Sequence, residues 1–246
     1  MMLLAVAGYA GALALAVRAW RGCGRPEAVR LWFAAGFAAN LVAIAVAGVR
    51  IGHLPLTNVG EVMMAVAACG YPAWRLYRRS IPAPLLPVLA AGMALLLGLH
   101  PALRGGAAKP LSPSLDSAWF IPHIAAYMLA YALCFLAAGF AAYGLWRRRE
   151  VELQAADRFA RHAFPLLTFG LLAGAFWAQA AWGDYWRWDP KENWALITWL
   201  AYAAGFHLPT ARGRAGWYLA GAGAIMMTML AVSFIKLFAG QHSYGG

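Results

Sequence analysis

Eight apolar stretches, most of them about as long as a membrane-spanning helix, make up most of this 246-residue chain. A helix needs about 20 apolar residues to cross the hydrocarbon core of a bilayer. Only 12% of the residues are charged, whereas a soluble domain carries roughly 25%, so lipid must solvate much of the surface. We therefore predict an all-α polytopic membrane helix bundle of about eight transmembrane helices, with residues 1–246 as a single membrane domain. The stretches cover roughly residues 2–20, 31–49, 58–75, 82–99, 121–146, 164–181, 193–208 and 216–238.

The positions of the basic residues predict the orientation of these helices. Segments 18–30, 75–79, 147–162 and 209–216 hold 14 Lys and Arg residues, whereas the alternate connections hold five. Basic loops stay in the cytoplasm, so we expect both termini outside. The net charge of +11 therefore comes mostly from loop residues that set the orientation of the helices. For this reason nucleic acid is not expected as a partner. The outer face would carry the loop 100–120, the loop 182–192 and the tail 239–246.

The three cysteines, Cys23, Cys69 and Cys134, are far apart, and none belongs to a C-x-x-C pair. This spacing argues against dithiol redox chemistry, a zinc finger and covalent haem attachment to this chain. Cys69 and Cys134 lie within apolar stretches and are expected to pack there.

A tryptophan-rich loop at residues 182–194 is the most unusual segment, with the sequence W-G-D-Y-W-R-W-D-P-K-E-N-W. Tryptophan and tyrosine favour the membrane interface, but an interfacial belt needs only one or two aromatic residues at each helix end. An aromatic shelf beside charged groups suits a flat ligand with an apolar face and acidic edges, and porphyrin fits this description. Its propionates would lie near Arg187 or Lys191. The other candidate binding residues of the loop are Trp182, Tyr185, Trp186, Trp188, Asp189 and Trp194.

Two histidines flank this loop in the sequence and are predicted on the same outer face. His123 lies where the fifth stretch begins, and His242 follows the last stretch. A lone interfacial histidine is usually a polar tip at the boundary. Two neutral imidazoles can, however, occupy both axial positions of haem iron, so we predict that His123 and His242 are metal ligands.

The other histidines are interpreted one by one. His207 is expected about 20 Å along the seventh helix, at 1.5 Å per residue. An ionisable residue within a membrane span is a functional candidate. Pro209 and Arg212 follow closely, however, so His207 also fits a position at the cytoplasmic boundary. His53 belongs to an outer turn in which Asn58 and Glu61 are expected to cap the next helix. His100 and His162 are interpreted as solvated loop residues.

These residues resemble the CcsA (ResC) family of System II cytochrome c biogenesis, haem-handling membrane proteins with a tryptophan-rich (WWD) motif. The resemblance rests on W-G-D-Y-W-R-W-D-P-K-E-N-W-A-L-I-T-W at 182–199 and continues through His207, Gly216-Trp217 and His242-Ser243-Tyr244-Gly245. The turn from Gly52 to Glu61 is also similar to an early segment of the family. Gln241 departs from the apolar residue that the family usually has before the histidine.

The resemblance implies a function and its partners. His123 and His242 would ligate the iron of non-covalently bound haem b beneath the loop on the periplasmic face of the bacterial inner membrane. His207 would bind haem within the membrane, together with a histidine of a CcsB (ResB) subunit. Haem would then be attached to an apocytochrome c at its CxxCH motif, so the chain would be one subunit of a holocytochrome c synthase (haem lyase type).

Three alternatives remain at this point. A HemX-like protein that modulates haem synthesis would keep the fold without engaging apocytochrome. A lipid-linked sugar transferase would need acidic metal ligands in several outer loops, and the outer acids are few. An ion or proton channel would need polar residues in the middle of several spans, where Asn40 and Gln179 are nearly the only ones.

Overall fold

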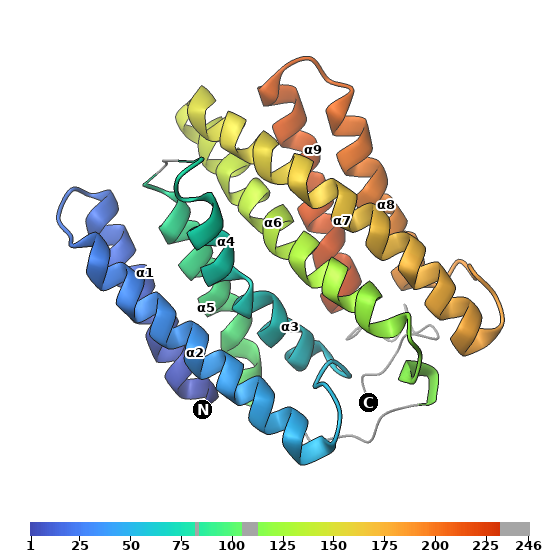
Figure 1. Cartoon of the computed structure of the whole chain (residues 1–246). Helices are drawn as coiled ribbons and strands as arrows, with labels where there is room; N and C mark the ends of the chain where they lie inside the picture. The colour runs from blue at the N-terminus through green and yellow to red at the C-terminus, as the bar shows by residue number, and fades with distance from the viewer. Residues whose placement is uncertain (82–83, 105–112, 232–246) are drawn as a thin grey trace. The chain divides into compact units, whose positions relative to one another are not determined.

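The computed structural model describes residues 1–81, 84–104 and 113–231, and every element in these ranges is helical. The chain divides into two compact units, residues 1–110 and 111–246 (Figure 1). The predicted all-α fold is confirmed. That residues 1–246 act as one membrane domain stays a prediction, and each unit is described by itself.

The first unit is built on the long pair α1 and α2, against which the shorter helices pack. α5 lies along α1, and α3 and α4 lie against α5. Its core is aromatic, with Phe33 at the centre in ring contact with Tyr9, Tyr71 and Trp74. The helices are α1 (Met2–Trp20), α2 (Pro26–Ile51), α3 (Val59–Ala68), α4 (Gly70–Tyr77) and α5 (Leu86–Arg104).

The predicted third span, 58–75, is broken in the structure. α3 ends at Ala68 and α4 starts at Gly70, because Pro72 has no N–H to bond to the preceding turn and its ring crowds that turn. The predicted caps are confirmed: the Asn58 side chain accepts a hydrogen bond from Glu61 N at 3.0 Å, and the Glu61 carboxylate accepts from Thr57 N at 2.7 Å.

Two other expectations for the first unit have clear outcomes. His100 does not lie in a solvated loop, since α5 continues through it to Arg104 and leaves it half-buried. Asn40 is fully buried, and its side-chain amide donates to Tyr9 Oη at 3.0 Å and to Met64 O at 3.1 Å. This polar group therefore joins three helices, a structural role that gives no support to a channel.

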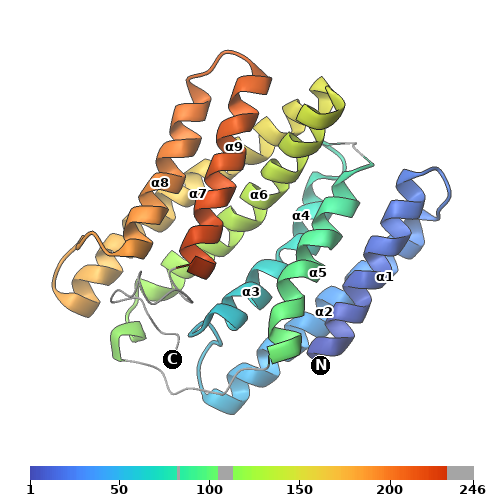
Figure 2. The same ribbon diagram turned by 180° about the vertical axis from the view of Figure 1, so that it is seen from behind.

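The second unit consists of two antiparallel helix pairs. α6 and α7 lie side by side, and the hairpin of α8 and α9 packs against them (Figures 1 and 2). Stacked rings join the pairs internally: Phe140 on Phe159, and Tyr202 on Tyr218. The elements are η1 (Pro113–Leu115), α6 (Phe120–Arg147), α7 (Glu150–Trp182), α8 (Pro190–Phe206), α9 (Ala211–Met226) and the π-helical η2 (Met227–Ala231).

α7 is much longer than the predicted span 164–181. The segment 147–162, expected as a short cytoplasmic helix or a helical extension, is continuous with it from Glu150 onward. Charged side chains one turn apart stabilise this polar first part, as the ion pairs Arg149–Glu152 and Asp157–Arg161 illustrate. His162 is therefore exposed on a helix and not in a loop.

Within residues 1–81, 84–104 and 113–231, five helices are long and apolar enough to cross a membrane: α1, α2, α5, α6 and α7. α8 and α9 have 17 and 16 residues, and α3 and α4 are separated by the break. The chain is thus a multi-pass membrane protein, and the eight crossings stay a prediction.

The second unit has two chemically different ends. At the basic end, Arg214 at the start of α9 contacts Asp157 near the start of α7, so segments 147–162 and 209–216 lie together. At the loop end, residues 183–189 of the tryptophan-rich loop connect α7 to α8. The start of α6 lies next to the end of α7. This separation agrees with the sidedness that the basic residues predict.

Candidate functional site

His123 lies in the first turn of α6, and its ring is held by a backbone group of α7. Nδ1 is 2.8 Å from Gly170 O. Because a carbonyl oxygen can only accept a hydrogen bond, Nδ1 must carry the proton, and the lone pair of the neutral ring is then on Nε2. A metal-binding histidine commonly donates its other ring N–H to a carbonyl or carboxylate in this way, which fixes its tautomer and orientation. The structure thus fixes the orientation of the His123 ring and places its lone pair on Nε2.

A small residue on α7 makes space for this ring. A Cβ atom at Gly174 would lie 2.6 Å from His123 Nδ1, so no larger residue fits without displacing the imidazole. Trp177 stacks on the ring with centroids 5.5 Å apart, and Tyr127 meets its edge at 5.0 Å. Gly170, Gly174 and Trp177 were not anticipated from the sequence, although their spacing of four and three residues places them on one helix face.

Aromatic contacts connect His123 to the tryptophan-rich loop. Trp177 is buried, donates from Nε1 to Ser114 O at 2.7 Å, and meets Trp182 edge-on at 4.9 Å. A second series leads from Trp119 through Phe176 to Tyr185, with centroid distances of 4.9 and 5.8 Å. The structure therefore brings together His123 and the loop, as predicted.

The polar side chains of the loop hold the loop itself. Arg187 donates to the Asp184 carboxylate at 2.8 Å and to Trp182 O. Asp189 is buried and caps α8 by accepting from Lys191 N at 2.9 Å. Both residues thus hold the shape of the loop, and their predicted contacts with a ligand stay a prediction.

Lys191 is the second cation of the tryptophan-rich loop, after Arg187. It is half-buried in the first turn of α8. Burial lowers the pKa of Lys191 from 10.5 to about 8, against the opposing attraction of Asp189. An anionic group that approaches this ammonium would relieve the cost of its burial.

The aromatic residues of the loop differ in exposure. The Trp188 and Tyr185 side chains are 69% and 55% exposed, whereas Trp182, Trp186 and Trp194 are half-buried. Trp186 meets Trp188 edge-on at 5.9 Å, and its Nε1 is buried without a hydrogen-bond acceptor among the described residues. Trp188 and Tyr185 are thus the rings best placed to meet a flat partner.

The two remaining predicted histidines are not part of this arrangement. His207 ends α8 at the basic end and is exposed. The 17 residues of α8 separate it from the loop by about 25 Å. His242 lies outside the described residues.

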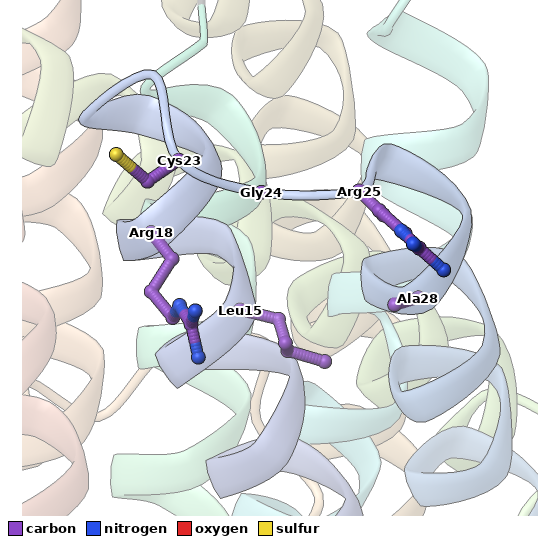
Figure 3. Close-up of a pocket in the computed structure, with 6 residues that line it drawn as sticks. All are labelled: Leu15, Arg18, Cys23, Gly24, Arg25 and Ala28. Atoms are coloured by element: carbon purple, nitrogen blue, oxygen red, sulfur yellow. The ribbon is translucent and has the colours of Figure 1, made fainter.

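A basic notch in the first unit carries no comparable chemistry. It lies at the turn between α1 and α2 and is lined by side chains that include Arg18, Cys23 and Arg25. Figure 3 shows the side chains of Arg18 and Arg25 on opposite sides of the notch, so they do not form a single anion-binding site. All three cysteines are free thiols.

The fold and this site define a class: a multi-pass helical membrane protein with a histidine presented beside an aromatic loop. A family model described as "Cytochrome C assembly protein" matches residues 56–240. The chain therefore belongs to the cytochrome c assembly protein family, and it is a membrane protein of cytochrome c biogenesis, as its resemblance to CcsA predicts.

Individual relatives support the CcsA branch. "Cytochrome c biogenesis protein CcsA" of Prochlorococcus marinus (strain MIT 9303) is 31% identical over 79% of this chain and 76% of the relative. The protein of the same name from Synechococcus sp. (strain CC9902) is 30% identical over 90% and 88%. That of Chlamydomonas reinhardtii is 31% identical over 80% of this chain and 62% of the relative.

Proposed function

We propose that this chain holds haem b non-covalently at the loop end of the second unit and presents it to apocytochrome c for covalent attachment. The observation that carries the proposal is the hydrogen bond from His123 Nδ1 to Gly170 O. It leaves the lone pair on Nε2 of a ring that aromatic contacts connect to the loop, where Tyr185 and Trp188 are exposed. His242 would supply the second axial nitrogen.

The residues of the loop end fit haem in three respects. An oriented imidazole suits the iron, the exposed rings of Tyr185 and Trp188 suit the porphyrin face, and the buried ammonium of Lys191 suits a propionate. Trp182 and Trp186 would support this surface from within, and Trp194 would border it in the first turn of α8. Arg187 and Asp189 would act indirectly, because they hold the loop.

The chemistry that haem brings is its pair of vinyl groups, to which the two cysteine thiols of a C-x-x-C-H motif add with formation of C–S bonds. The residues of this chain would orient the bound molecule, keep its edge at the membrane surface and hold its iron through His123 and His242. A positioning role of this kind needs no acid or base within the loop.

The proposal extends to topology and partners. The chain would cross the bacterial inner membrane eight times with both termini and the loop end on the periplasmic side, and it would act with a CcsB-type subunit as a holocytochrome c synthase. His207, at the basic end, would receive haem on the opposite side, together with a histidine of that subunit. Its exposure in the turn after α8 suits a residue that meets a partner.

Absorption spectroscopy of the purified protein with its CcsB-type partner tests the proposal. We expect a bis-histidine Soret band that is lost in His123→Ala and in His242→Ala and restored by free imidazole, which can fill the vacated axial position. His162→Ala, at an exposed position of α7, is the matched control and should leave the band intact. A Soret band unchanged in both variants would overturn the assignment of the axial ligands.

A further inference from the structure

Trp188 has a backbone conformation that a bulky residue rarely adopts. Its φ is +58°, and Arg148 is the other non-glycine residue with positive φ in the described part of the chain. An aromatic residue in the left-handed region is an outlier that persists only where surrounding contacts hold it. Its indole is nevertheless 69% exposed, so packing of the side chain is not what holds it.

Hydrogen bonds hold the backbone of the residues on both sides of Trp188. Glu192 Oε2 accepts from Arg187 N at 2.9 Å and from Asp189 N at 3.1 Å. Asn193 Nδ2 donates to Trp188 O at 2.9 Å. The peptide unit between Trp188 and Asp189 is therefore bound at its N–H and at its C=O. The N–H of Arg187, the residue before Trp188, is bound to the same carboxylate oxygen.

Glu192 does more here than an ordinary capping residue. In a capping box, the third residue of the helix accepts only from the N–H of the cap, which in this chain is Asp189. The additional bond to Arg187 N reaches back across Trp188. Because Glu192 and Asn193 belong to the first turn of α8, they are rigid supports for this part of the loop.

We infer that Glu192 is a positioning residue that holds the exposed indole of Trp188 in place for the apolar face of a porphyrin. The inference rests on the proposed function for the identity of the ligand but not for the geometry. The Glu192 carboxylate works as an acceptor for two neutral N–H groups. The neutral amide oxygen of Gln has the same reach and can replace it, whereas Ala cannot accept and Asp is one methylene too short.

The geometry can be tested without haem. In protein labelled with 5-fluorotryptophan, the ¹⁹F resonance that disappears in Trp188→Phe belongs to Trp188. We expect this resonance to keep its position in Glu192→Gln and to shift or broaden in Glu192→Ala and Glu192→Asp, while the resonances of Trp74 and the other tryptophans outside the loop stay in place. An unmoved Trp188 resonance in Glu192→Ala would overturn the inference.

Haem titration then tests whether Glu192 affects haem affinity by positioning the indole of Trp188. We expect Glu192→Ala and Trp188→Ala each to weaken haem binding about two- to tenfold, the span of one aromatic contact, and Glu192→Gln to bind as the wild type. If Glu192 acts through Trp188, the double variant binds no more weakly than Trp188→Ala alone. Additive losses would overturn the inference. Absence of haem binding in the wild type would instead overturn the proposed function and leave the ¹⁹F result valid.

Discussion

The two ends of α8 are both held by charged side chains, but in different ways. At the loop end, the carboxylates of Asp189 and Glu192 accept from N–H groups in and before the first turn. At the basic end, Arg214 donates to Leu208 O and Pro209 O just after the last turn. Anionic groups at a helix N-terminus and cationic groups at its C-terminus both complement the helix dipole, so each end is matched in sign.

The difference is in the origin of the contacts. Six hydrogen bonds of the loop join residues within 182–193. The turn after α8 depends instead on Asp157 of α7, which accepts from Arg161, Arg214 and Tyr218 at 2.6–2.9 Å. The loop is thus shaped by its own sequence, whereas the turn that carries His207 is shaped by the packing of α7 against α9.

Removal of the Asp157 carboxylate should have the largest effect on stability. Asp157→Ala leaves Arg214, whose side chain is only 15% exposed, without its ion-pair partner, and the loss of one partner of such a pair costs about 3 kcal/mol. We expect that decrease in the free energy of unfolding of the detergent-solubilised protein, with the ¹⁹F resonance of Trp188 unchanged. Asp116→Ala, which removes an exposed carboxylate, is the control. A shift of the Trp188 resonance in Asp157→Ala would show that the two ends are not independent.

One element of the loop end breaks the pattern of local contacts. His123 is oriented by Gly170 and Gly174 of α7, about 50 residues away in the sequence. Gly174→Ala would place a Cβ atom 2.6 Å from Nδ1 and should displace the ring at a cost of about 2 kcal/mol for the extra methyl group. We expect a lower haem occupancy that free imidazole restores in part. Gly223→Ala on α9, where nothing lies within 4 Å of the added Cβ, is the matched control, and equal haem occupancy in both variants would contradict this role of Gly174.

The same distinction explains what the sequence could predict. The helices, the cap at Asn58 and the closeness of His123 to the loop all follow from local patterns or from the alternation of loops across a membrane. The wrong expectations concern the bounds of helices: the span 58–75 is broken between α3 and α4, and His100 and His162 lie in helices instead of loops. The first turns of α7, which include His162, are polar and are stabilised by ion pairs that involve Arg149, Arg161 and Arg214.

The part of the site that was missed is on α7. The hydrogen bond from His123 to Gly170 spans 47 residues, and that from Trp177 to Ser114 spans 63. A run of apolar residues does not reveal which of its faces meets a histidine on another helix. The ion pair of Arg187 with the Asp184 carboxylate, three residues away, was not anticipated either.

Removal of the helix cap at the loop end should lower the stability less than removal of the ion pair at the basic end. Asp189→Ala removes the N-cap of α8, which should cost about 1 kcal/mol, whereas Asp189→Asn keeps an equally good cap. If Asp189 acts only as a cap, Asp189→Asn should bind haem as the wild type does, measured by titration. Weaker binding in Asp189→Asn with unchanged stability would show that its charge meets the ligand directly.

Substitution of Lys191 should have the smallest effect on stability, and the pKa of this residue reports directly on the loop end. The chain has three lysines, so reductive methylation with ¹³C gives few signals, and Lys191→Arg identifies the one from Lys191. Because burial lowers the pKa of Lys191 to about 8, we expect this signal to titrate well below the usual lysine pKa of 10.5.

The same pKa shift makes stability depend on pH. The folded state binds fewer protons than the unfolded state between pH 8 and 10.5, so the contribution of Lys191 to stability rises with pH across that window. Lys191→Met should therefore be most stabilising below pH 8 and lose its advantage above it. A haem propionate at this ammonium would raise the pKa again, so a pKa that stays the same on haem binding would place the propionates elsewhere.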